Sequence, residues 1–283
     1  MLSEKQLEEY RQQGYTVSRQ LLGAEHVAAL LAEAERVSAG NTLARHDKSR
    51  FEMEPNQPPE GTRLRRIYEP CTYYPTFRAL SESDRLLECV KQLLGPDLEF
   101  HYSKINMKPP AIGSVVEWHQ DLVYYPLTNS DSVSILIYLD DADRSNGCLQ
   151  VLPGYHLRKP LNHTRDGYFQ GGITEKVDES TAVALEAPAG SVIFMHCLTP
   201  HASIANRSDR PRRTLILSYR ASDAYPIFAG EGTVAGESYV RLVRGVKRPI
   251  ARFTFTEFPI PRSKERFRSL YELQEQARKE RIA

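Results

Sequence analysis

Apolar residues in the first hundred positions recur at the spacing of amphipathic helices. Helices are predicted over residues 3–13, 27–37 and 86–94. The first begins with Ser3 and Gln6 at the spacing of a capping box, in which each side chain bonds the other residue's backbone. Gly40 and Gly95 follow the other two helices and can end them.

The segment between the second and third predicted helices has a different composition. Residues 41–61 are polar and contain Pro55, Pro58 and Pro59, so a loop is predicted there. Long loops in compact domains are often functional, and this one is therefore a candidate lid.

Beyond position 98 the apolar pattern changes to the alternation of β-strands. Strands are predicted over residues 100–107, 133–139, 191–195 and 214–219. Around the last strand, Arg212, Thr214 and Ile216 share one face, while Arg213 and Leu215 lie on the other. Short strands separated by turns favour a mainly β barrel or sandwich over a parallel α/β sheet. No glycine-rich phosphate-binding loop supports a nucleotide-binding fold.

These elements predict one domain over residues 1–283. Its parts are a mainly helical flank (1–97), a β-rich core (98–222) and a C-terminal extension with a helix (223–283). The last helix is predicted from about Ser263 to Lys279. Its apolar stripe consists of Phe267, Leu270, Leu273 and Ala277. We expect it to pack on the outside of the core or against a second subunit.

Composition limits the partners and the location. The 283 residues are 41% hydrophobic and 26% charged, which is ordinary for a globular protein. The net charge of +1 argues against a dedicated nucleic-acid-binding protein. No apolar run is long enough to cross a membrane, and the N-terminus lacks the apolar core of a secretion signal. The four scattered cysteines are typical of reduced thiols, so a cytoplasmic location is expected.

The strongest chemical signal is a set of possible metal ligands. His119 and Asp121 are two residues apart, so on a strand both side chains point the same way. With one distant histidine they make the two-histidine, one-carboxylate set that holds iron(II) and leaves coordination positions open. Arg212 lies a short strand beyond the histidine-containing segment 196–201, where a cation can bind a dicarboxylate co-substrate.

The distal histidine ligand and the basic residue each have an alternative candidate nearby in the sequence. His196 and His201 both lie in the distal segment, and their odd separation puts them on opposite faces of a regular strand, so only one can be a ligand. The neighbouring Ser203 and the position of Arg212 favour His201. Arg213 is the rival of Arg212, and such a cluster of arginines is often a solvated face.

Several motifs together resemble the phytanoyl-CoA dioxygenase family. They are KPP at 108–110, WHQDL at 118–122, NGCLQVLPGYH at 146–156 and HAS at 201–203, followed by Asn206 and Arg212. The resemblance implies a double-stranded β-helix of the jelly-roll or cupin kind, flanked by N- and C-terminal helices. It also implies an oxygenase that uses iron(II), 2-oxoglutarate and O2.

The resemblance assigns roles to individual residues. His119, Asp121 and His201 would be the catalytic residues, because they would bind the iron. Arg212 and Ser203 would hold the distal carboxylate of 2-oxoglutarate.

Further roles carried over are less direct. Gln120 is placed like a family residue near the co-substrate, and Arg66 lies where some members have a cationic contact. At Ile137 the sequence departs from the tryptophan that the family can carry, so an altered pocket shape is expected.

The activity implied is hydroxylation of an unactivated C–H bond, with release of succinate and CO2. Asp121 favours hydroxylation because halogenating relatives need a small residue at that position. The substrate would be a small molecule such as an acyl thioester, an amino acid or a natural product, bound by a monomer or homodimer. The tyrosines at 102, 124, 125 and 138 are either pocket residues or core residues. The basic run Arg241, Arg244, Lys247 and Arg248 would either meet an anionic substrate or form a solvated surface.

Two other classes of function compete with the oxygenase. One is a zinc-dependent isomerase or hydrolase on a similar barrel, which the basic residue at Arg212 disfavours. The other is a non-catalytic binding module, which the complete set of ligands disfavours.

Overall fold

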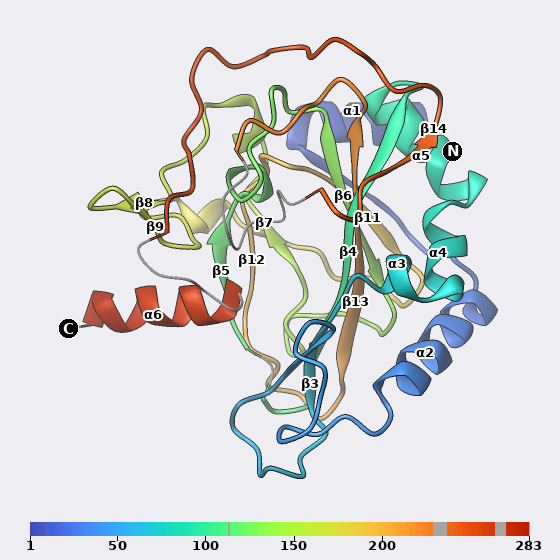
Figure 1. Cartoon of the computed structure of the whole chain (residues 1–283), viewed down its shortest axis with the longest axis vertical. Coiled ribbons are helices and arrows are strands. Elements are labelled where there is room, and N and C mark those ends of the chain that lie inside the picture. The colour runs from blue at the N-terminus through green and yellow to red at the C-terminus, as the bar shows by residue number, and fades with distance from the viewer. Residues whose placement is uncertain (113, 229–236, 264–269, 283) are drawn as a thin grey trace.

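The computed structural model describes residues 1–112, 114–228, 237–263 and 270–282. It consists mainly of antiparallel β-sheets with a few helices (Figure 1). The large sheet has the strand order β1-β11-β6-β13-β4-β3-β2, and β14 also pairs with β4. Its strands are β1 (Tyr15–Ser18), β2 (Phe51–Met53), β3 (Leu64–Tyr68), β4 (Leu98–Lys108), β6 (Ser132–Tyr138), β11 (Val192–His196), β13 (Arg212–Ala221) and β14 (Arg241–Arg244).

A smaller sheet has the order β10-β7-β12-β5. Its strands are β5 (Val116–His119), β7 (Gln150–Val151), β10 (Val183–Ala184) and β12 (His201–Ser203). The remaining short elements are the hairpin β8 (Thr164–Arg165) with β9 (Tyr168–Phe169), and the single turns of 3-10 helix η1 (Asp121–Val123), η2 (Tyr155–Leu157) and η3 (Glu179–Thr181). Leu136 of the large sheet and Val151 of the small one belong to one apolar cluster, so the two sheets share an interior.

The helices are divided between two sides of the molecule (Figure 1). They are α1 (Glu4–Gln13), α2 (Ala24–Ser38), α3 (Pro70–Tyr73), α4 (Pro75–Ser81), α5 (Asp84–Leu94) and α6 (Leu270–Ile282). Helix α5 contacts the central strands β4, β6 and β13, whereas α6 contacts β5 of the small sheet. The predicted helices of the N-terminal region are confirmed, including the reciprocal capping box of Ser3 and Gln6 at the start of α1.

Strand β13 shows how the alternating sequence divides the large sheet into two faces. Leu215 and Leu217 are fully buried in the apolar cluster that the sheet forms with the helices. Thr214 and Ile216 instead line a cavity on the opposite face, toward the small sheet. The predicted faces of this strand are therefore confirmed, and burial of the leucines on the helical side stabilises the layer behind the cavity.

Two predictions about the outer segments need correction. The segment 41–61 is not only a loop, because Phe51–Met53 forms β2 and pairs with β3 at the edge of the large sheet. The apolar-polar-apolar pattern of these three residues was too short to be separated from the prolines that follow. The helical flank consequently also supplies three strands to the sheet. Residues 264–269 of the predicted last helix, Phe267 among them, lie outside the described residues, and α6 is described from Leu270.

Across the described ranges, no helix combines the length and the apolar character that crossing a membrane requires.

Candidate metal centre

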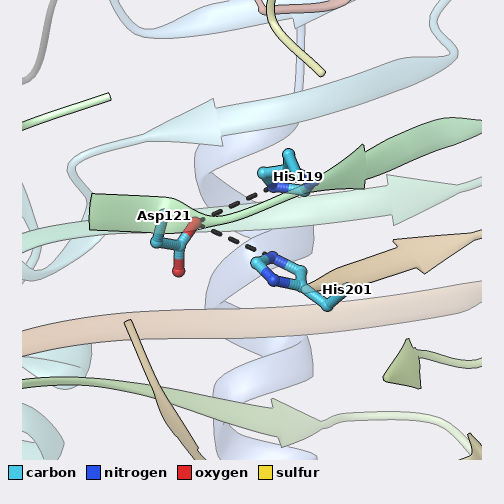
Figure 2. A group of neighbouring side chains, drawn as sticks. All are labelled: His119, Asp121 and His201. Carbon is cyan, nitrogen blue, oxygen red and sulfur yellow. Dashed lines mark ion pairs between the residues drawn. The ribbon is translucent and has the colours of Figure 1, made fainter. Parts of the chain in front are cut away.

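The ends of two neighbouring strands bring three possible metal ligands together. His119 ends β5, Asp121 begins the turn η1, and His201 begins β12 directly opposite His119. One nitrogen or oxygen from each of these buried residues lies within 4.8 Å of the other two. Figure 2 shows both imidazole rings turned toward the carboxylate of Asp121.

Hydrogen bonds fix the orientation of both imidazole rings. Nδ1 of His119 lies 2.8 Å from the carbonyl oxygen of Glu117, and Nδ1 of His201 lies 3.0 Å from that of Thr199. A carbonyl oxygen accepts only from a protonated nitrogen, so the lone pair of each neutral ring is on Nε2. Both Nε2 atoms face Oδ1 of Asp121, at 3.8 and 3.7 Å. The donors therefore have the arrangement that iron(II) coordination needs.

The electrostatics of the three groups favour a metal over protons. Burial lowers the pKa of His119 and of His201, which keeps both rings neutral and able to donate a lone pair. Burial alone would raise the pKa of Asp121, but His201, Lys104 and His119 lower it below its ordinary value. A buried carboxylate beside two neutral imidazoles is the donor set of a divalent metal site.

A cavity opens between the two sheets at these ligands. It is lined by Arg66, Lys104, Asn106, Val116, His119, Asp121, Ser134, Leu136, Tyr138, Leu149, Met195, His201, Ala202, Ser203, Arg212, Thr214 and Ile216. The polar side chains come from both sheets, and three of them are cations. The cavity can therefore hold an anionic molecule next to the metal ligands.

Arg212 and Ser203 both lie on the cavity wall, and both are buried. Nη1 of Arg212 donates to Thr214 at 2.8 Å, while its buried Nε has no partner among the described residues. Arg213 points to the other side of β13, where Asp140 and Glu35 pair with it. Of the two arginines, Arg212 is thus the one with unused donors inside the cavity.

Of the other two predicted site residues, Arg66 lines the cavity and Gln120 does not. Arg66 lies on the cavity wall, where its Nε donates to Asn106 at 2.9 Å. Gln120 is fully buried away from the cavity lining, and its side-chain amide donates to Leu198 and accepts from the amide of Leu161. Gln120 therefore secures the backbone between the two ligands His119 and Asp121.

His196 does not join the three ligands. Its ring packs against the rings of Tyr10 and His156, with centroids 6.1 and 5.1 Å away. Its Nδ1 accepts a hydrogen bond from the amide of Leu198. Burial, followed by the nearby His156, lowers its pKa to about 3, so the ring is a neutral part of the packing.

One expectation about the pocket is wrong, and two alternatives left open by the sequence are decided in favour of a structural role. Ile137 belongs to the apolar cluster on the helical side of the large sheet, so its departure from the family pattern does not shape the cavity. Among the four candidate tyrosines, only Tyr138 lines the cavity, and Tyr102, Tyr124 and Tyr125 pack in apolar clusters beside it. The basic run pairs with acidic residues, as in the contacts of Arg241 with Glu82, Arg244 with Glu88, Lys247 with Glu99 and Arg248 with Asp97.

Sequence reasoning missed several polar residues at the site, among them Lys104, Asn106 and His163. Lys104 and Asn106 line the cavity from β4, and their spacing of two residues in the predicted strand 100–107 would have placed them on one face. His163 is buried, and its Nε2 accepts from the amide of Gln120 at 3.0 Å. Nothing in the sequence around His163 signals that long-range contact.

Comparisons with known proteins agree with this geometry. The model of the family described as phytanoyl-CoA dioxygenase (PhyH) matches residues 10–214. A probable alpha-ketoglutarate-dependent hypophosphite dioxygenase of Stutzerimonas stutzeri is 33% identical over 234 residues, covering 80% of this chain and 81% of the relative. An ectoine dioxygenase of Bordetella parapertussis is 29% identical over 241 residues, covering 78% and 76% of the two chains.

Solved structures give the same result. The crystal structure of EctD from S. alaskensis with 2-oxoglutarate and 5-hydroxyectoine superposes with a TM-score of 0.66 at 26% identity, over 80% of this chain and 78% of that one. The form with bound Fe gives a TM-score of 0.69 at 23% identity, over 88% of each chain, and supports the fold.

The chain therefore belongs to the phytanoyl-CoA dioxygenase family. It is an Fe(II)- and 2-oxoglutarate-dependent dioxygenase, with O2 as the second co-substrate.

Proposed function

We propose that this dioxygenase hydroxylates a C–H bond of a small organic substrate and releases succinate and CO2. The observation that carries the proposal is that one cavity is lined both by the possible metal ligands His119, Asp121 and His201 and by Arg212. Relatives named for hypophosphite and for ectoine support a small substrate. The same relatives favour an oxygenase over a zinc-dependent hydrolase or a non-catalytic module.

In the proposed enzyme, His119, Asp121 and His201 hold iron(II). When bound, the metal supplies activation of O2 at the expense of 2-oxoglutarate. The protein fixes the ligands through the carbonyl oxygens of Glu117 and Thr199, so that little rearrangement is needed when the metal enters.

The co-substrate is proposed to lie between the metal ligands and Arg212. Arg212 has donors free inside the cavity, and a guanidinium can bind a carboxylate through two parallel hydrogen bonds. Ser203 lines the cavity from the small sheet, and its hydroxyl would donate a further bond. Arg66 on β3 is a further candidate cationic contact of the co-substrate. Gln120 would keep the ligand turn in position without touching the co-substrate.

The two facing sheets also support the finer description of the fold. We infer that they form a double-stranded β-helix, and that residues 1–283 constitute a single dioxygenase domain. In such an arrangement the small sheet supplies the two histidines, and the large sheet supplies Arg212 and the hydrophobic floor. Closing the metal between two sheets excludes bulk water from the reacting bond.

The experiment is anaerobic addition of iron(II) and 2-oxoglutarate to the metal-free protein, followed by O2 and candidate substrates. We expect a weak visible charge-transfer band from the iron and 2-oxoglutarate chelate, and succinate in proportion to hydroxylated product. The Asp121→Ala variant should fold but give neither signal. A folded wild-type protein that forms no band, or that consumes 2-oxoglutarate without hydroxylating any carbon substrate, would contradict the proposal.

A further inference from the structure

Lys104 is a cation on the cavity wall that the proposed binding of 2-oxoglutarate by Arg212 does not use. It is half-buried on β4, and no described carboxylate forms an ion pair with it. Its recorded contact is with the ring of Tyr102, whose centroid lies 5.5 Å from Nζ. Burial, and then the neighbouring Arg66, lower the pKa of Lys104 to about 8. Placing an ammonium group there costs free energy unless an anion accompanies it.

The neighbours of Lys104 add further donors on the same wall. Asn106 is two residues along β4, so its side chain lies on the same face. Arg66 on β3 pairs directly with Asn106 and donates to its Oδ1. That bond occupies the Asn106 oxygen, which leaves the Asn106 amide hydrogens available as donors. Lys104, Arg66 and Asn106 thus make up a donor-rich patch beside the metal ligands.

A charge count shows that this patch is not needed to balance the co-substrate. Arg66, Lys104 and Arg212 line the cavity, and Asp121 is the carboxylate among the lining residues. Glu52 lies 3.5 Å from Arg66 and offsets it from behind. The dication iron(II) and the dianion 2-oxoglutarate cancel each other. With Asp121 and Glu52 also counted, one positive charge stays uncompensated, and Lys104 forms no ion pair with a described carboxylate.

The strand register separates Lys104 from the proposed co-substrate anchor. Arg212 pairs with Lys108, while Lys104 pairs with Ile216, four residues further along β13. Four residues of strand span about 13 Å. Lys104 is instead near the metal ligands, because its charge contributes to the lowered pKa of Asp121. The two cations are therefore placed to meet two different anionic groups.

We propose that Lys104 and Asn106 form a subsite that binds the oxyanion group of the substrate, such as a carboxylate or a phosphonate, with Arg66 holding the Asn106 side chain in place. This inference rests on the proposed hydroxylase function and names the substrate class for that site: a small organic anion. The subsite would hold the anionic end by charge-assisted hydrogen bonds and so present the adjacent carbon to the metal.

The test uses the wild-type protein with iron(II) and 2-oxoglutarate under anaerobic conditions. Methylphosphonate and acetate are the anionic probes, and dimethyl sulfone is the neutral control. We expect each anion that binds to shift the chelate band and raise the melting temperature in a saturable way, while dimethyl sulfone does neither. A response to methylphosphonate alone would indicate a tetrahedral oxyanion, and a response to acetate alone a carboxylate.

Three variants assign the effect to Lys104. Lys104→Met should weaken binding of the responding anion about tenfold or more. Lys104→Arg should largely restore it. The control Lys159→Met removes a lysine whose side chain is 93% exposed, and it should behave as wild type.

The titration of 2-oxoglutarate separates this inference from the proposed function. If Lys104→Met weakens 2-oxoglutarate as much as the anion, Lys104 is a co-substrate contact and the inference is wrong. It is equally wrong if the wild-type chelate forms but responds to no anion, or if Lys104→Met binds the anion normally. Failure of the wild-type chelate to form would instead contradict the proposed function.

Discussion

The hydroxyl of Ser134 donates a hydrogen bond of 2.6 Å to Oδ2 of Asp121, the oxygen that faces away from the two histidines. This bond holds the carboxylate so that Oδ1 points toward both imidazoles. Partners of this kind behind a metal ligand typically contribute a factor of about 10 to 100 in metal affinity. We expect Ser134→Ala to weaken iron(II) binding by about that factor, as measured by metal titration of the metal-free protein.

Ser218 offers a matched control for Ser134. It lies directly opposite on β13, and its hydroxyl does not bond Asp121. Ser218→Ala should leave the iron(II) affinity within about twofold of wild type, since it removes a hydroxyl of the same size from the neighbouring strand. Equal losses in both variants would mean that Ser134 acts through packing and not through the ligand.

The choice of distal ligand makes a second prediction. His201→Ala should abolish the chelate band, because two of the three donors cannot hold the metal in the cavity. His196→Ala should retain the band, because that ring packs against Tyr10 and His156 on the other side of the chain. The visible spectra of both variants, recorded at matched folded fractions, decide between the two histidines. A band in His201→Ala would exclude our assignment.

The two neighbouring arginines make a third prediction. Arg212→Met should raise the dissociation constant of 2-oxoglutarate by about two to three orders of magnitude, because a buried charged contact is lost. Arg213→Met removes an ion pair with Asp140 on the other face of β13, so its effect should fall on stability. The chelate titration measures the first effect and chemical unfolding the second. An unchanged 2-oxoglutarate affinity in Arg212→Met would rule out this anchor.

The pH dependence of stability gives a fourth prediction. The pKa of His196 is lowered to about 3 by burial and by His156, from an ordinary value near 6.5 in the unfolded chain. The unfolded state therefore binds the proton more tightly, so the stabilising contribution is complete above about pH 6.5 and is lost as the pH falls toward 3. Each pH unit in that window costs about 1.4 kcal/mol of unfolding free energy.

The His196→Gln variant isolates this contribution. Urea unfolding of both proteins at pH 7.5, 6 and 5 should show a shallower loss of stability for the variant. Parallel pH profiles would mean that His196 is not the neutral buried group described above.

The sequence identified most elements whose pattern is local. The capping box at Ser3 and the alternation of β13 depend on neighbouring residues, and both were predicted correctly. The strand β2 was missed because Phe51–Met53 offers only three positions and is stabilised by its pairing with β3. Short edge strands owe their existence to tertiary partners more than to their own residues.

The candidate site was predictable only in part for the same reason. The histidine and carboxylate spacing pointed to His119, Asp121 and His201, and the structure brings these three together. The partners Ser134 and Lys104 come from strands distant in sequence, and no motif connects them to the ligands. Gln120 sits inside the motif, yet its side chain turns toward Leu198, because neighbours on an extended chain point in opposite directions.

The direct pairing of His119 with His201 has a mechanical consequence. An ion bound by both rings would tie together two segments separated by 82 positions, in the way that a covalent cross-link does. Such a tie reduces the entropy gained when the long intervening segment opens. Iron would then act as a reversible cross-link. Binding of the metal would itself lower the frequency of local opening in the segment between His119 and His201.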